Sequence, residues 1–181
     1  SMGSAAVGDD VYGEDEAVNL LEGKISQLAG KEAALFFSSG TQSNLVALLT
    51  HCQRGDEYIV GQQAHTFKYE GGGGAVLGGI QPQPIEFEED ATINLLNISN
   101  AIKPDDEHFA KTKLLCLENT HAGKVLPLDY LIVVRRLCSE KRLKMHLDGA
   151  RVFNASISSN VPLDQITKNF HSVSICLSKG L

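Results

Sequence analysis

Hydrophobic residues recur along the chain at two different spacings, and the segments with each spacing alternate. From Glu14 to Ala29 apolar residues repeat every three or four positions, acidic residues open the segment and Gly30 follows it, so we expect a helix. A second helix is expected from Asn44 to Cys52, and Pro127 opens a third, amphipathic one. Two further helices are predicted over Thr66–Leu77 and Leu163–Lys168.

Short apolar runs between these helices predict strands. The runs are Glu57–Val60, Gln81–Phe87, Lys113–Glu118, Lys144–Leu147 and Ser172–Leu177, and Ala33–Phe37 is expected to form a strand or a tight buried segment. Pro82 and Pro84 place the second run near a sheet edge. Repeated strand and helix alternation predicts an α/β fold with three α/β/α layers around a mostly parallel sheet.

The glycine tract Gly71–Gly74 lies inside the helix predicted from Thr66 to Leu77. Each glycine should weaken a helix by up to about 1 kcal/mol. We therefore expect some other feature of the fold, such as a close approach of backbone, to favour glycine there.

Composition restricts the class of protein. The 181 residues are 43% hydrophobic and 21% charged, which is enough apolar material for one folded domain. The net charge is −6 and the basic residues are scattered singly, so no nucleic-acid partner is expected. The apolar runs are far shorter than the roughly 20 residues that cross a bilayer, so we expect no membrane contact.

Four widely spaced cysteines give no metal-binding or disulfide pattern. Cys52, Cys116, Cys138 and Cys176 form no Cys-x-x-Cys pair, and no histidine cluster has the spacing of metal ligands. We interpret them as small core residues in a reducing compartment and expect a cytoplasmic protein without a bound metal.

Polar residues follow several of the apolar runs, where a parallel sheet binds its ligands. They are Ser39, Gly40, Thr41, His65, His121, Asp148, Arg151 and Lys179. Asp148 and Lys179 are separated by about the length of one strand-to-strand crossover, so both can emerge from the same edge of the sheet. Each residue alone is more typical of an ordinary loop, cap or surface position.

Together, however, these residue types are what pyridoxal phosphate requires. Lys179 offers an amine for a Schiff base with the cofactor's aldehyde, and Asp148, which we expect to be solvated, could stabilise a protonated pyridine nitrogen. The turn Ser39–Thr41 before a helix suits a phosphate. Arg151 could contact the phenolate oxygen or form a structural ion pair. His65 could lie on the pyridine face, and His121 could face the substrate.

Six collinear segments resemble the low-specificity threonine aldolases, which are pyridoxal-phosphate enzymes of the aspartate-aminotransferase-like superfamily. The segments are Val7–Asp15, Lys31–Phe36, Ser39–Thr41, Asn119–His121, His146–Arg151 and Cys176–Gly180. The resemblance implies the fold of the large cofactor-binding domain, a homo-oligomer, either a tetramer or a dimer, and cleavage of L-threonine or L-allo-threonine to glycine and an aldehyde.

By the same resemblance, each candidate residue receives a role. Lys179 is the Schiff-base lysine, Asp148 the partner of the pyridine nitrogen and Arg151 the contact of the phenolate oxygen. His65 is the stacking ring, Gly40 and Thr41 contact the phosphate with Ser39 beside them, and His121 takes the hydroxyl proton of the amino-acid substrate, directly or through water.

Departures from the family pattern leave two alternatives open. Family members are roughly twice this length, so residues 1–181 are expected to be part of the large domain, without the family's opening segment and C-terminal small domain. A related β-eliminating lyase would share Asp148, Arg151 and Lys179, although Asn119–His121 favours the aldolase. A truncated, non-catalytic remnant is the second alternative.

Overall fold

The computed structural model describes residue 3 and residues 5–180, and its sheet is entirely parallel. Its five strands lie in the order β2-β1-β3-β4-β5. Their bounds are β1 Asp56–Gly61, β2 Gln81–Ile85, β3 Lys111–Glu118, β4 Lys144–Gly149 and β5 Ser172–Ile175. All five strand predictions are therefore confirmed, and β2 with its two prolines is an edge strand, as expected.

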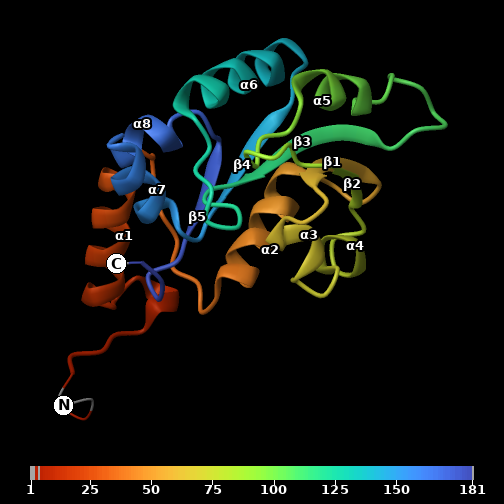
Figure 1. Cartoon of the computed structure of the whole chain (residues 1–181). Helices are drawn as coiled ribbons and strands as arrows, with labels where there is room; N and C mark the ends of the chain where they lie inside the picture. The colour runs from red at the N-terminus through yellow and green to blue at the C-terminus, as the bar shows by residue number, and fades with distance from the viewer. Residues whose placement is uncertain (1–2, 4, 181) are drawn as a thin grey trace.

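Helices cover both faces of this sheet, which confirms the three-layer prediction (Figure 1). The longer helices are α1 Glu16–Leu28, α2 Gly40–His51, α6 Leu128–Glu140 and α7 Val152–Ser159. The shorter ones are α3 His65–Lys68, α4 Gly73–Val76, α5 Leu95–Ala101, α8 Leu163–Thr167 and the 3₁₀ helix η2 Asp10–Tyr12. The alternation in the sequence did not predict α5 and α7. Among the described residues, no helix has the length and apolar character needed to cross a membrane.

Alternate residues of β1 and β3 supply two separate cores. Ile59, Leu115 and Met145 face the layer that contains α6 and α8, whereas Tyr58 and Leu114 face α2. Because side chains alternate across a strand, β1 and β3 each contribute to both cores. Helix α1 adjoins α7 and α8 in Figure 1, and Thr167 Oγ1 donates to the carbonyl of Ala29 at 2.6 Å.

The helix predicted over Thr66–Leu77 is wrong as a single element, because α3 and α4 are separate. Gly71 and Gly72 have φ values of +62° and +67°, a left-handed conformation that glycine adopts without strain. At Gly74 an added Cβ would lie 3.1 Å from Leu48 Cδ1, so α4 packs closely on α2. The glycine tract therefore makes a turn and then a close helix contact.

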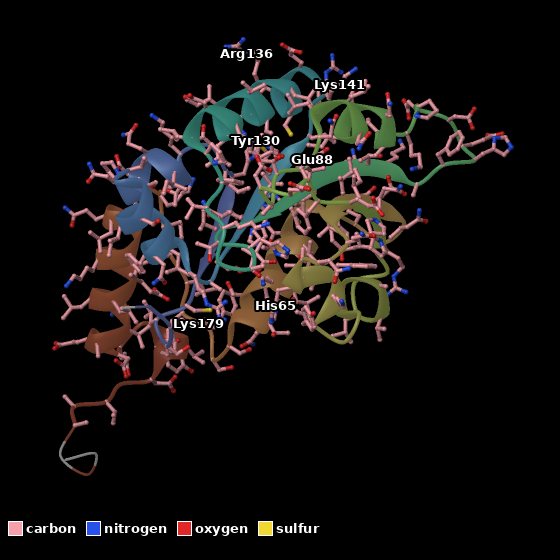
Figure 2. All side chains as sticks on the ribbon, viewed as in Figure 1. His65, Glu88, Tyr130, Arg136, Lys141 and Lys179 are labelled. Atoms are coloured by element: carbon pink, nitrogen blue, oxygen red, sulfur yellow. The ribbon has the colours of Figure 1, made fainter. Side chains whose placement is uncertain are left out.

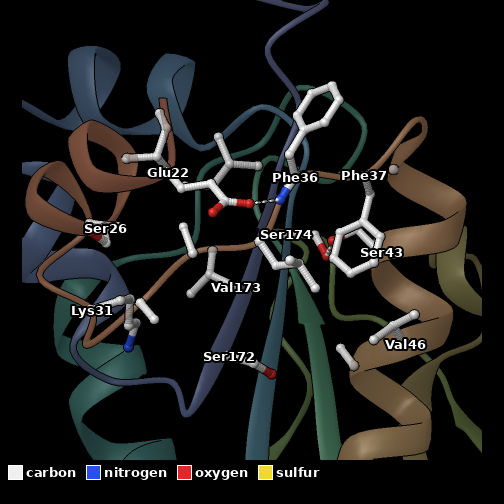
Figure 3. Close-up of a pocket in the computed structure, with 18 of the residues that line it drawn as sticks. Glu22, Ser26, Lys31, Phe36, Phe37, Ser43, Val46, Ser172, Val173 and Ser174 are labelled. Atoms are coloured by element: carbon white, nitrogen blue, oxygen red, sulfur yellow. Dashed lines mark hydrogen bonds between the residues drawn. The ribbon is translucent and has the colours of Figure 1, made fainter. Parts of the chain in front are cut away.

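The segment Ala33–Phe37 is neither a strand nor buried, contrary to expectation. Leu35 is 67% exposed and Phe36 52% exposed. Among the described residues, β5 pairs only with β4, and a groove of about 720 Å³ separates β5 from this segment (Figure 3). A strand needs a neighbouring backbone to bond to, so the β propensity of this run is not realised. The segment is held to α1 by a hydrogen bond in which the Phe36 N–H donates to Glu22 Oε1 at 2.7 Å.

Candidate active site

A second cavity, of about 300 Å³, lies at the carboxyl edge of the sheet and gathers residues from five separate segments. It is lined by Ser38, Ser39, Gly40, Thr41, Asn44, His65, Glu70, Glu118, Thr120, Asp148, Ala150, Arg151, Ser174, Cys176, Ser178 and Lys179. In Figure 2, Lys179 and His65 lie at the same end of the molecule. The structure thus brings together every predicted site residue except His121.

Asp148 is placed by the alternation of side chains along β4. Met145 and Leu147 point into one core, so His146 and Asp148 point to the opposite face, toward α2. Asp148 is only 3% exposed, which corrects the expectation of a solvated carboxylate. Its Oδ1 accepts from the Ala150 N–H at 3.0 Å, and its Oδ2 accepts from Asn44 Nδ2 at 2.8 Å. Both oxygens are therefore held in place.

The first turn of α2 meets the segment that follows β5. Ser39 caps the helix by accepting from the Gln42 N–H at 3.2 Å. A Cβ added at Gly40 would lie 2.9 Å from Cys176 Sγ, so only glycine allows this approach without a shift. The positive end of a 12-residue helix, together with Thr41, therefore opens directly onto the cavity.

His65 begins α3 and is held at two points. Its backbone N–H donates to Glu118 Oε2 at 2.8 Å, and its ring Nδ1 lies 2.9 Å from Glu70 Oε1. Burial raises the pKa of Glu70, and the Asp148 carboxylate adds to this, while hydrogen bonds from Asn44 and His65 oppose it. The imidazole is thereby anchored on one side, with its other nitrogen left for further contacts.

Arg151 and Lys179 follow β4 and β5 and both line the cavity. Within residues 3 and 5–180, neither forms an ion pair. The alternative interpretation of Arg151 as a structural ion pair therefore has no support from the described part of the chain. Both cations are available for a ligand in the cavity.

His121 lies beside the cavity rather than in its wall. Its ring stacks on Phe87 with centroids 4.1 Å apart and an interplanar angle of 23°. Its Nδ1 is 3.3 Å from Glu118 Oε2, but the geometry is not that of a hydrogen bond, and this nitrogen is buried without a hydrogen-bond partner among the described residues. Because Glu118 does line the cavity, its carboxylate connects His121 to the site.

Sequence reasoning missed three residues of the cavity wall that surround Asp148. Asn44 and Glu70 are joined to each other and to the site by hydrogen bonds, and Glu118 lies beside Asp148 in the register of β3 and β4. Asn44 could have been noticed as an amide within a helix that packs on the sheet. Glu70 immediately precedes the glycine tract, which is the only local signal it carries.

Three of these side chains also have the arrangement of a possible metal site. One ligand atom from each of His65, Glu70 and Asp148 lies within 4.8 Å of the others. Glu70 Oε1 already accepts hydrogen bonds from Asn44 and His65, and Asp148 Oδ2 accepts one from Asn44. These hydrogen bonds account for the cluster, so we assign no metal to it.

Comparison with known proteins agrees with the resemblance seen in the sequence. The chain is 56% identical over 181 residues to the low specificity L-threonine aldolase of Escherichia coli K12, covering 100% of this chain and 54% of that protein. It is 46% identical over 187 residues to a probable low-specificity L-threonine aldolase 2 of Arabidopsis thaliana, covering 100% of this chain and 53% of the relative. The chain thus spans about half the length of these relatives.

The solved structures agree as well. A threonine aldolase of Leishmania major superposes with a TM-score of 0.79 at 26% sequence identity, covering 92% of this chain and 49% of that one. The family model described as beta-eliminating lyase matches residues 1–181. Since that match covers the full length of the sequence, the chain belongs to the beta-eliminating lyase family.

Proposed function

We propose that the protein carrying this sequence is a pyridoxal-phosphate-dependent lyase that cleaves L-threonine, L-allo-threonine and related 3-hydroxy amino acids to glycine and an aldehyde. The observation that carries the proposal is the cavity itself. A lysine amine, a buried carboxylate, a guanidinium, an imidazole and a helix N-terminus reach it from four segments that are distant in the sequence. The names of the relatives support the aldolase among the possible lyase reactions.

The donor set fits this cofactor group by group. Lys179 offers the amine for the aldehyde, and Asp148 offers a buried carboxylate whose two oxygens are already oriented, as a pyridine N–H requires. Arg151 has no ion-pair partner among the described residues and would donate to the phenolate oxygen.

The remaining groups would hold the phosphate and the ring. The N–H groups at the start of α2, with the Ser39 and Thr41 hydroxyls, would hold the phosphate, and Gly40 lets the backbone come close. His65, fixed by Glu70, would lie against the ring.

When bound, the cofactor supplies an electron sink for the bond between Cα and Cβ of the amino acid. The chain's own residues orient the substrate and move its proton. We propose that His121 takes the proton of the β-hydroxyl, directly or through a water, and that the Glu118 carboxylate beside Nδ1 stabilises the charge that the ring then acquires. Stacking on Phe87 limits the rotation of this ring.

We also propose that these 181 residues are part of a large cofactor-binding domain in a longer, cytoplasmic homo-oligomer, a tetramer or a dimer, that forms glycine in amino-acid metabolism. The length of the relatives supports the first point. Exposed apolar side chains support the homo-oligomer, because Tyr69 at the end of α3 and Val76 and Leu77 at the end of α4 are 61%, 76% and 64% exposed.

The experiment is product analysis with the full-length protein that carries this sequence, loaded with pyridoxal phosphate and given L-threonine or L-allo-threonine. We expect acetaldehyde and glycine in equal amounts. Lys179→Ala should abolish the visible absorbance that the bound cofactor gives, whereas Lys24→Ala, on the exposed side of α1, should leave it unchanged. Identical spectra for the wild type and Lys179→Ala would contradict the assigned lysine.

A second candidate is β-elimination, which the description of the matching family favours. It would share the same cofactor contacts but release ammonia and a keto acid from the substrate. Detection of those products in place of acetaldehyde and glycine would replace the aldolase with the eliminating lyase. A protein that stays colourless with the cofactor would support the non-catalytic alternative.

A further inference from the structure

A chain of hydrogen bonds, buried at one end and partly buried at the other, runs from Asp148 between α2 and the strands β4 and β5. His51 Nε2 lies 2.7 Å from Ser172 Oγ, and Ser172 Oγ lies 2.8 Å from His146 Nδ1. His146 Nε2 lies 3.1 Å from Asn44 Oδ1, and Asn44 Nδ2 donates to Asp148 at 2.8 Å. The chain therefore begins at His51, on the wall of the large groove, and ends at the carboxylate of the candidate active site.

The direction of every hydrogen bond in this chain follows from the end at Asp148 and Glu70. Asn44 Nδ2 lies 2.8 Å from both Asp148 Oδ2 and Glu70 Oε1, and only an NH₂ group can donate to two acceptors at once. Asn44 Oδ1 must then accept from a protonated Nε2 of His146. A reversed amide would place its oxygen against the oxygens of two carboxylates.

His146 is well suited to maintain this direction. It is fully buried, and burial lowers its pKa to about 3, with repulsion from His51 adding to this, so the ring is neutral at pH 7. A neutral ring with its hydrogen on Nε2 accepts at Nδ1, so Ser172 donates to it and His51 Nε2–H donates to Ser172. Each polar atom that joins the chain thus has a defined role.

We propose that Asn44 is a positioning residue for the cofactor-binding carboxylate Asp148, and that His146 holds the Asn44 amide in its donating orientation. This inference rests on the proposed function. The Asn44 hydrogen bond aims the Asp148 carboxylate, while the second hydrogen of the same amide separates Asp148 from Glu70. His146 is not among the residues that line the cavity, so it acts on the cofactor only through Asn44.

The test compares two replacements of His146 in the full-length protein, with the dissociation constant for pyridoxal phosphate as the readout. His146→Leu removes the donor that holds the Asn44 amide but fills much of the same space. We expect its cofactor affinity to fall about tenfold, because Asn44 then no longer holds its hydrogen bond to the charged Asp148. His146→Gln keeps an N–H donor for Asn44 Oδ1 and should restore affinity to within about threefold of the wild type. If His146 only filled space in the core, His146→Leu should bind the cofactor more tightly than His146→Gln.

Asn44→Asp provides an independent test that keeps the side-chain shape. It replaces a double donor by a third acidic group beside Asp148 and Glu70, so we expect cofactor affinity at least about tenfold weaker. Asn97→Asp makes the same change on the exposed surface of α5 and should bind the cofactor as the wild type does. Near-UV circular dichroism shows whether each variant is folded. If His146→Leu does not fold, the affinity of Asn44→Asp alone tests the inference.

Two outcomes would overturn the inference. One is wild-type affinity in folded His146→Leu or Asn44→Asp, and the other is an equal loss in His146→Gln and His146→Leu. In either case a wild type that binds the cofactor and cleaves threonine leaves the proposed function intact. A wild type that does not bind pyridoxal phosphate would contradict the proposed function itself.

Discussion

Replacing Gly61 by alanine tests how tightly the end of β1 is closed by Phe87. An added Cβ at Gly61 would lie 1.9 Å from Phe87 Cζ and 2.4 and 2.5 Å from its two Cε atoms. Because carbon atoms pack at about 3.5–4.0 Å, the ring would have to move by roughly 1.6–2.1 Å. Phe87 packs against both hydrophobic cores and stacks on His121, so this shift would disturb packing and the candidate base together.

We expect Gly61→Ala to lower the free energy of unfolding by about 1–3 kcal/mol, the usual cost of overpacking a core. A loss of about 2 kcal/mol corresponds to a melting temperature lower by about 4–8 °C for a domain of this size. Urea denaturation and a thermal melt of the full-length protein measure both quantities. The matched control is Gly23→Ala, in the interior of α1 with nothing within 4 Å of the added Cβ, which should stabilise the protein by up to about 1 kcal/mol.

A double-mutant cycle decides whether the contact with Phe87 is the cause. Phe87→Leu shortens the side chain that the methyl group introduced by Gly61→Ala would strike. Combining the two changes should therefore recover about 1 kcal/mol relative to the sum of the single changes. Additive effects, or a Gly61→Ala protein as stable as the wild type, would refute the reasoning.

Three further predictions concern buried polar groups. The lowered pKa of His146 means that the unfolded chain binds more protons than the folded protein between about pH 6.5 and pH 3, so the stability contributed by neutral His146 is present above pH 6.5 and is lost as the pH falls. The urea midpoints at pH 7.5 and pH 5 should therefore differ less in His146→Gln than in the wild type. His108→Gln, at an exposed position, should leave this difference unchanged. Lys103→Met removes the ammonium that lies 3.5 Å from Oε2 of the fully buried Glu57, and should destabilise the protein by about 3 kcal/mol in urea denaturation. A loss below about 0.5 kcal/mol would show that the hydrogen bonds from Thr112 and Gln81 are enough to stabilise the Glu57 carboxylate. Asp148→Asn should lower turnover of L-threonine roughly 100- to 1,000-fold with an unchanged far-UV circular dichroism spectrum, and turnover within threefold of the wild type would contradict its role.

Much of the fold could be predicted from local patterns. The five strands, the helix that follows Asp15, the helix that follows Pro127 and the edge position of β2 all follow from spacing, caps and prolines. Helix α2 begins at Gly40, earlier than expected, because Ser39 caps it. The expectation that Asp148 and Lys179 reach one edge of the sheet is also met, since parallel strands joined by helical crossovers present their carboxyl ends together.

Other features depended on contacts between distant parts of the chain. The run Ala33–Phe37 has the composition of a strand, but the described residues offer it no neighbouring strand to pair with. The burial of Asp148 could not be foreseen either, because it depends on α2 packing across the end of β4.

The chain by itself therefore determined which elements form and which residue types stand at the end of each strand, because caps, periodicity and turns act between neighbours in sequence. Only the tertiary structure decided that Asn44 lies between Asp148 and Glu70, that His146 supports it from behind and that His121 stands outside the cavity wall. These relations join residues as much as 104 positions apart. They arise because buried polar atoms need hydrogen-bond partners, which here come from other layers of the fold. A local sequence pattern does not indicate which residues those partners are.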